Sequence, residues 1–99
     1  MKFIVAKKNG PHGLLLVITD ADIVGKKFEE GRLQLDLSKE FYQGEEKNKK
    51  EVLLLIETAQ HLHLTGKEAV SLGVTAEIIE KKKILWVKNI PHAEGVAGQ

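Results

Sequence analysis

The clearest hydrophobic pattern in the chain is an alternation of leucines with polar residues from Leu33 to Leu37. Successive side chains of a β-strand point to opposite faces, so this spacing predicts a strand with one buried and one exposed face. The strand lies within residues 22–44, which end in a short helical turn at Phe41 and Tyr42. We expect this segment to form the centre of the fold.

Three other apolar runs have the length and composition of strands. Residues 3–6 and 14–18 are rich in β-favouring side chains, and Pro11 lies between them with a glycine near each side. This arrangement predicts an antiparallel hairpin, because proline and glycine favour the turn. Residues 84–87 are apolar without alternation, which predicts a strand inside the sheet.

The main helix is predicted where apolar residues recur at helical spacing, over residues 52–59. Asn48 and Glu51 precede it at the spacing of a capped helix start. Because this helix is so apolar, we expect it to lie across one face of the sheet. The charged residues 45–51 are interpreted as a solvated lead into it.

Two shorter helices are predicted after the main one. Thr65 and Glu68 have the spacing of a capping box for a helix over residues 67–72, and a third helix is expected over residues 76–80. His61 to Leu64 are interpreted as the connection between the first two helices.

These elements predict an α+β fold, with an antiparallel or mixed sheet of about four strands and one main helix packed across it. At 99 residues the chain is expected to be a single domain over residues 1–99. Residues 93–99, rich in glycine and alanine, are expected to be a frayed tail.

Several of these residues resemble a known family. The pattern from Val24 to Leu37, the later Phe41-Tyr42-x-Gly44 and the sequence from Ile90 to Ala93 resemble a family of small archaeal proteins catalogued as a domain of unknown function. The resemblance covers nearly the whole chain. It implies a compact cytoplasmic α+β domain, and it implies no activity, cofactor or catalytic residue.

Composition restricts the function classes. The absence of cysteine excludes disulfides, thiol catalysis and cysteine-bound zinc. No apolar run reaches the length of about 20 residues that spans a bilayer, and none resembles a signal peptide, so we expect a cytoplasmic protein without membrane contact. Abundant lysine and glutamate with a single methionine is typical of a heat-adapted surface.

The four histidines raise two chemical hypotheses. His61 and His63 are two residues apart, so an extended segment would place both on one face, where His92 or a carboxylate could complete a metal site. We prefer the interpretation that they are ordinary polar residues of a connection, and we expect no metal and no cofactor.

The second hypothesis is a small hydrolase or metal-dependent enzyme that uses His92, His12 and the Glu29-Glu30 pair for acid–base catalysis. Each of the two histidines follows a proline. We prefer the alternative that Pro91 and His92 end a strand, because no nucleophile or oxyanion site accompanies them. No catalytic residue is therefore assigned.

Our preferred function is a non-enzymatic binding module. Lysines occur in groups, and the candidate binding residues are Lys26, Lys27, Arg32, Tyr42 and His92. The expected partners are RNA or a protein of the translation or RNA-processing machinery, since clustered lysines and an aromatic ring suit phosphates and bases. A homodimer that pairs exposed sheet edges is a further alternative.

Overall fold

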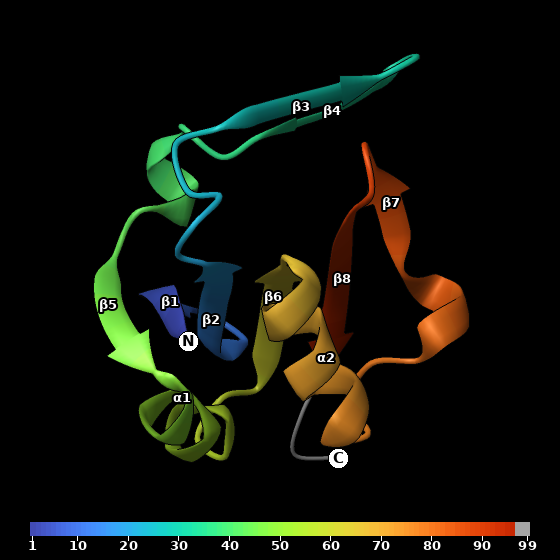
Figure 1. Ribbon diagram of the computed structural model, residues 1–99. Helices are drawn as coiled ribbons and strands as arrows, with labels where there is room; N and C mark the ends of the chain where they lie inside the picture. The colour runs from blue at the N-terminus through green and yellow to red at the C-terminus, as the bar shows by residue number, and fades with distance from the viewer. Residues whose placement is uncertain (97–99) are drawn as a thin grey trace.

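The computed structural model describes residues 1–96 and has an α+β architecture, as predicted. Figure 1 shows a mixed sheet with two helices on one face and a separate hairpin beyond the other face. The six strands of the sheet are β1 (Lys2–Gly10), β2 (Gly13–Asp20), β5 (Glu45–Asn48), β6 (His61–Thr65), β7 (Leu85–Val87) and β8 (Ile90–Val96). The other elements are the hairpin strands β3 (Lys27–Glu30) and β4 (Leu33–Asp36), the helices α1 (Lys49–Ile56) and α2 (Lys67–Thr75), and the 3-10 turns η1 (Glu40–Tyr42) and η2 (Lys81–Lys83).

The strand order of the sheet is β5-β1-β2-β6-β8-β7. β1 and β2 form the predicted hairpin, closed by the paired residues Gly10 and Gly13. β2 and β6 are parallel, and every other pair is antiparallel. The connection between the parallel strands β2 and β6 contains the β3–β4 hairpin, η1, β5 and α1, so it is long enough for the crossover that a parallel pair requires.

The expected sheet of about four strands is wrong in its count. β5 has the sequence Glu-Glu-Lys-Asn and was interpreted as a solvated charge cluster. It pairs with β1 along the sheet edge, where its side chains reach solvent, so its strand structure depends on backbone hydrogen bonds and leaves no hydrophobic pattern.

The predicted connection at residues 61–64 is also wrong. These residues belong to β6, which lies inside the sheet between β2 and β8. Leu62 and Leu64 are at most 1% exposed and face the helices, whereas His61 and His63 face the opposite side.

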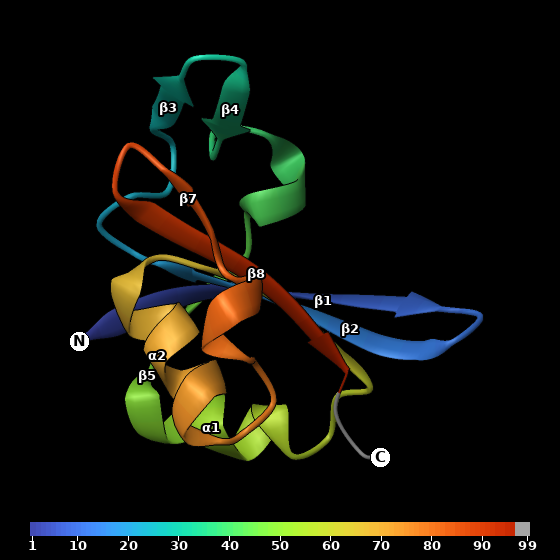
Figure 2. The same cartoon turned by 90° about the vertical axis from the view of Figure 1, so that its right-hand side faces the viewer.

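The main hydrophobic core lies between the sheet and the two helices. Figure 2 shows both helices on the same side of the sheet. α1 contributes Val52 and Ile56, which confirms that the main helix packs across one face of the sheet. Asn48 and Glu51 form the predicted capping box at its start. Neither α1 nor any other helix within residues 1–96 is long and apolar enough to cross a membrane.

The β3–β4 hairpin does not form the centre of the fold. It stands apart from the sheet, on the side opposite the helices (Figure 2). Leu35 and Leu37 are buried in a second, smaller hydrophobic cluster with Val87, while Leu33 is 51% exposed. The alternation predicted the strand correctly, but the strand pairs only with its neighbour in sequence.

The strand predicted inside the sheet from residues 84–87 is instead the edge strand β7. Leu85 and Trp86 are 62% and 52% exposed. β8 follows it and continues to Val96, paired with β6, so residues 93–96 of the expected frayed tail form a strand. Residues 97–99 lie outside the described residues.

The start of α2 is capped by a residue that is distant in sequence. The predicted cap, Thr65, belongs to β6 and does not cap α2. The carboxylate of Asp20 accepts hydrogen bonds from the backbone N–H groups of Glu68 and Ala69, at 3.0 and 2.8 Å. Gly66 has a φ of 109°, and a Cβ at this position would meet the Asp20 carboxylate. Glycine is therefore required where the chain turns from β6 into α2.

Candidate functional site

The sheet face opposite the helices carries four aromatic rings in contact, which we call the ring cluster: Phe41, Tyr42, His63 and His92. The alternation of β6 and β8 places the two histidines side by side, with ring centroids 4.3 Å apart. The η1 turn places Phe41 against His63, with 4.9 Å between the ring centroids, and 5.1 Å from the Tyr42 ring. The contacts are edge-to-face, the geometry that aromatic pairs prefer.

Hydrogen bonds orient both imidazoles. His63 Nε2 lies 3.2 Å from a carboxylate oxygen of Glu94, which is its neighbour on β8. His92 Nδ1 lies 2.8 Å from the hydroxyl oxygen of Thr65. Thr65 is flanked in turn by Thr19 of β2, so a polar row crosses three strands beside the rings.

Both histidines are neutral at pH 7. Burial, together with a smaller effect of the neighbouring His92, lowers the pKa of His63 to about 4. Burial also lowers the pKa of His92. Glu94 does not offset the burial of His63, because its carboxylate is largely exposed and water screens its charge.

Two buried polar atoms on this face have no hydrogen-bond partner within residues 1–96: Nδ1 of His63 and the hydroxyl oxygen of Thr19. In the neutral His63 ring the proton is placed on Nε2, where the Glu94 carboxylate accepts it, so Nδ1 is an acceptor. Burying such a group without a partner costs about 1–3 kcal/mol. The two unpaired polar atoms therefore lower the stability of the fold, so packing alone does not account for the ring cluster.

A groove of about 460 Å³ opens beside the ring cluster. This volume is within the range of small-molecule sites, about 300–1,000 Å³. The ammonium of Lys8 lies 5.0 Å from the centre of the Phe41 ring at one side of the groove. The lining residues are Leu15, Phe41, His61, Leu62, His63, Glu94, Gly95 and Val96.

Among the predicted binding residues, the structure brings Tyr42 and His92 into one cluster. The three basic residues are on the separate hairpin: Lys26 and Lys27 at its base and Arg32 in its turn. Lys27 forms an ion pair with Glu29, at 3.2 Å. The basic side chains are therefore at two ends of the hairpin and do not line the groove.

The structure does not assemble the proposed acid–base set. His12 is exposed in the turn of the β1–β2 hairpin, next to the first residue of β2. His92 lies near the other end of β2, because it contacts Thr65, which is the neighbour of Thr19. Six residues of strand separate these ends by about 20 Å. Glu30 accepts a hydrogen bond from the backbone of Lys88, at 3.2 Å.

His61 and His63 share a face of β6, as expected for an extended segment. His61 is paired with Val96 rather than with a further ligand. Within residues 1–96, no three His, Asp or Glu side chains are arranged to hold a metal ion.

Phe41, Glu94 and Thr19 were not predicted as site residues, and His63 was considered only as a metal ligand. A signal for the position of His63 was present, because His61-Leu62-His63-Leu64-Thr65 alternates polar and apolar residues with the period of a strand. The contribution of Phe41 was not visible, since its position over β6 depends on the path of η1 across the sheet.

The fold is similar to that of a crystal structure of an uncharacterized conserved protein from Methanopyrus kandleri, with a TM-score of 0.70 and 19% identity, over 100% of this chain and 96% of that chain. No curated protein matches the sequence. The model of the family described as Protein of unknown function (DUF424) matches residues 8–96. This confirms the resemblance to a family of unknown function, and the chain belongs to that family.

Proposed function

We propose that the groove beside the ring cluster binds single-stranded RNA without catalysis. The observation that carries the proposal is that the π-bearing side chains of Phe41 and His61 line an open groove on a sheet face, with Lys8 next to them. Single-stranded nucleic acids are bound by aromatic rings that stack on bases and by cations that contact phosphates.

Stacking is favoured by the fixed position of Phe41. Its ring contacts Tyr42 and His63 edge-to-face, so little side-chain freedom is lost when a base packs against it. Each stacked base contributes about 1–3 kcal/mol in such sites.

The charges around the groove assign an orientation to the strand. The exposed Glu94 carboxylate can accept hydrogen bonds from base amino groups but repels phosphates. Lys8 attracts phosphates. The sugar-phosphate backbone therefore follows β1 on the Lys8 side, and the bases point toward β8.

Thr65 and His92 form a hydroxyl–histidine pair, an arrangement found in some enzymes, but this pair does not favour catalysis here. Thr65 is the hydroxyl bound to His92, but its side chain is 0% exposed and cannot contact a substrate. A binding role that does not need this hydroxyl agrees better with the burial. The RNAs of the translation and RNA-processing machinery are the class that we expect it to bind.

Fluorescence anisotropy with a labelled single-stranded RNA decamer of mixed sequence tests the proposal. Binding should weaken with salt at a log–log slope of about −1 to −2, since few lysines are involved. His61→Ala and Lys8→Ala should each weaken it about tenfold. Lys82→Ala, at an exposed position of η2, is the matched control and should leave the affinity unchanged.

Absence of binding at 50 mM salt would contradict the proposal. Equal losses for His61→Ala and Lys82→Ala would contradict the groove as the site. Circular dichroism of each variant separates lost binding from lost structure.

A further inference from the structure

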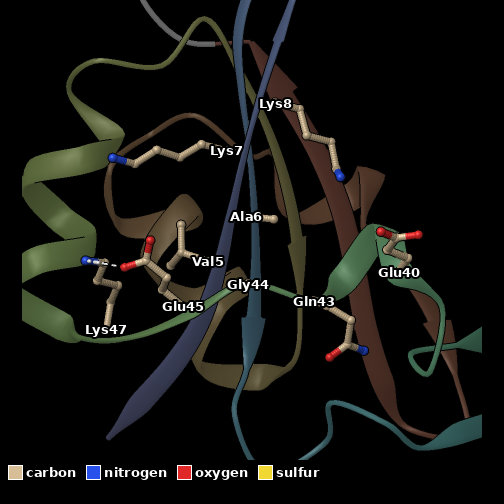
Figure 3. Close-up of a pocket in the computed structure, with 9 residues that line it drawn as sticks. All are labelled: Val5, Ala6, Lys7, Lys8, Glu40, Gln43, Gly44, Glu45 and Lys47. Atoms are coloured by element: carbon tan, nitrogen blue, oxygen red, sulfur yellow. Dashed lines mark ion pairs between the residues drawn. The ribbon is translucent and has the colours of Figure 1, made fainter.

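The outer edge of β1 is only partly covered. β5 pairs with β1 from Lys2 to Val5, and the chain then leaves the edge at Gly44. A Cβ on Gly44 would collide with the carbonyl oxygen of Val5, so the chain crosses the edge in direct contact with the backbone (Figure 3). Beyond this crossing, residues 7–10 of β1 have no strand beside them on this side among residues 1–96. We call them the open edge.

The pairing of β1 with β2 determines which groups the open edge presents. Gly10 and Gly13 close a two-residue turn, so hydrogen-bonded pairs alternate along the hairpin from that point. Lys8 is then bonded to β2, whereas Lys7 and Asn9 direct their backbone N–H and C=O groups outward. Val5 follows the same alternation, since its carbonyl faces Gly44.

The opposite edge of the same hairpin, formed by β2, has hydrogen-bond partners almost to the turn. β6 pairs with β2 from Leu15 onward. At Leu14, where β6 has not yet begun, Gln60 takes the place of a strand residue: its side-chain oxygen accepts from the Leu14 N–H at 2.9 Å, and its own N–H donates to the Leu14 carbonyl at 3.0 Å. The β2 side is therefore paired to near the turn, and the β1 side is left free.

The side chains beside the open edge are basic. Figure 3 shows Lys7 directed toward the side of α1 and Lys8 directed toward η1. Neither forms an ion pair within residues 1–96. Glu45 is engaged by Lys47 at 3.5 Å, and Glu40 lies on the Lys8 side of the cavity that these residues line.

These charges discriminate between occupants. A second copy that paired its own β1 here would bring two pairs of lysines together, and like charges on adjacent strands are destabilising. An acidic strand would neutralise them. A strand is also required to satisfy the backbone groups of Lys7 and Asn9, which a nucleic acid does not do in a regular ladder.

We propose that the open edge binds an extended acidic peptide segment of a partner protein, which adds a strand to the sheet beside β5. Backbone hydrogen bonds to Lys7 and Asn9 provide the ladder, and the carboxylates on one face of the peptide contact Lys7. Because Glu40 lies on the Lys8 side, acidic residues are preferred on the side that faces Lys7.

The probe is a capped hexapeptide of alternating glutamate and valine, followed by NMR of the ¹⁵N-labelled protein. The amides of Lys7 and Asn9 should exchange with solvent at least fivefold more slowly when the peptide is bound. The amide of Lys8 should not change, because it is already bonded to β2.

Two variants distinguish the contribution of the lysine charges to peptide binding from that of the backbone hydrogen bonds. Lys7→Glu with Lys8→Glu should weaken the glutamate peptide at least tenfold and create binding of the matching lysine peptide. Asn9→Pro removes one outward N–H, and a proline is tolerated at a strand edge whose N–H faces solvent. It should weaken the peptide about fivefold and leave RNA affinity unchanged. Lys81→Glu with Lys82→Glu on η2 is the charge control and should have no effect.

Unchanged exchange at Lys7 and Asn9 with saturating peptide would overturn the proposal. Equal peptide affinity for the wild type and the Lys7→Glu, Lys8→Glu variant would do the same. Since Asn9→Pro and His61→Ala act on different sites, failure of this proposal is distinguishable from failure of the RNA proposal.

Discussion

At the scale of single residues, His63 is the most informative side chain. It lies on a strand inside the sheet, contacts three other rings and keeps one buried ring nitrogen without a hydrogen-bond partner in the part of the chain that the structure describes. Its charge state is controlled by burial, because the nearby carboxylate of Glu94 is in solvent. An imidazole in this position is neutral in the folded protein.

His63 should make the folded protein sensitive to acid. Its pKa is about 4 when folded and about 6.5 when unfolded, so between these values the unfolded state binds a proton that the folded state does not. Stability present at pH 7 is lost as the pH falls, by about 2 kcal/mol at pH 5 from His63. The lowered pKa of His92 acts in the same direction. Urea unfolding at pH 7 and pH 5 measures the difference.

The matched variant is His63→Leu, which removes the titrating group. Its stability should change less between pH 7 and pH 5 than that of the wild type, by about 2 kcal/mol. An equal pH dependence in both proteins would mean that His63 does not titrate as described.

At the scale of elements, the start of α2 shows how a local signal can mislead. Thr65 and Glu68 have the spacing of a capping box, but Thr65 is committed to β6 and its hydroxyl contacts His92. Asp20, at the end of β2, provides the cap instead. The cap therefore joins a strand to a helix that begins far away in sequence.

Asp20→Ala should destabilise the protein by about 1–2 kcal/mol, the cost of losing a helix cap. Two backbone N–H groups, those of Glu68 and Ala69, lose their acceptor. Thermal and urea unfolding measure the loss. Thr65 should not substitute as the cap in this variant, so a stability equal to wild type would contradict the assignment. Asp22→Ala, at a nearby exposed position, is the control.

At the scale of the whole molecule, the buried apolar side chains divide into two clusters. The larger lies between the sheet and the helices, and the smaller joins the β3–β4 hairpin to Val87 of β7. The hairpin is tied at its base by hydrogen bonds that join Leu37 to Gly25 and Lys26. Because it pairs with no strand of the main sheet, we expect it to open separately from the sheet.

Hydrogen exchange should show this separation. Amides of β3 and β4 should exchange faster than those of β2 and β6. Leu35→Ala should accelerate exchange in the hairpin alone, whereas Leu64→Ala should accelerate it throughout and cost about 2–5 kcal/mol. Uniform acceleration by both variants would show that the two clusters open as one unit.

Much of the local structure could be predicted. The turn residues between Gly10 and Gly13 predicted the first hairpin, and Asn48 with Glu51 predicted the start of α1. β5 could not be predicted, because an edge strand held by backbone bonds needs no hydrophobic pattern. β6 alternates like a strand, but its position after a helix favoured a connection.

The sequence by itself determined the elements whose signals are local: periodic apolar spacing, turn residues and a helix cap within four positions. Only the tertiary structure decided which strands are neighbours, and so which side chains meet. His63, His92 and Phe41 come from three segments that become adjacent through the strand order and the path of η1. The reason is physical: backbone pairing between strands is the same for every side chain, so a single strand does not specify its neighbour. The strand order is selected by the burial of side chains on both faces of the sheet, which depends on all the strands together.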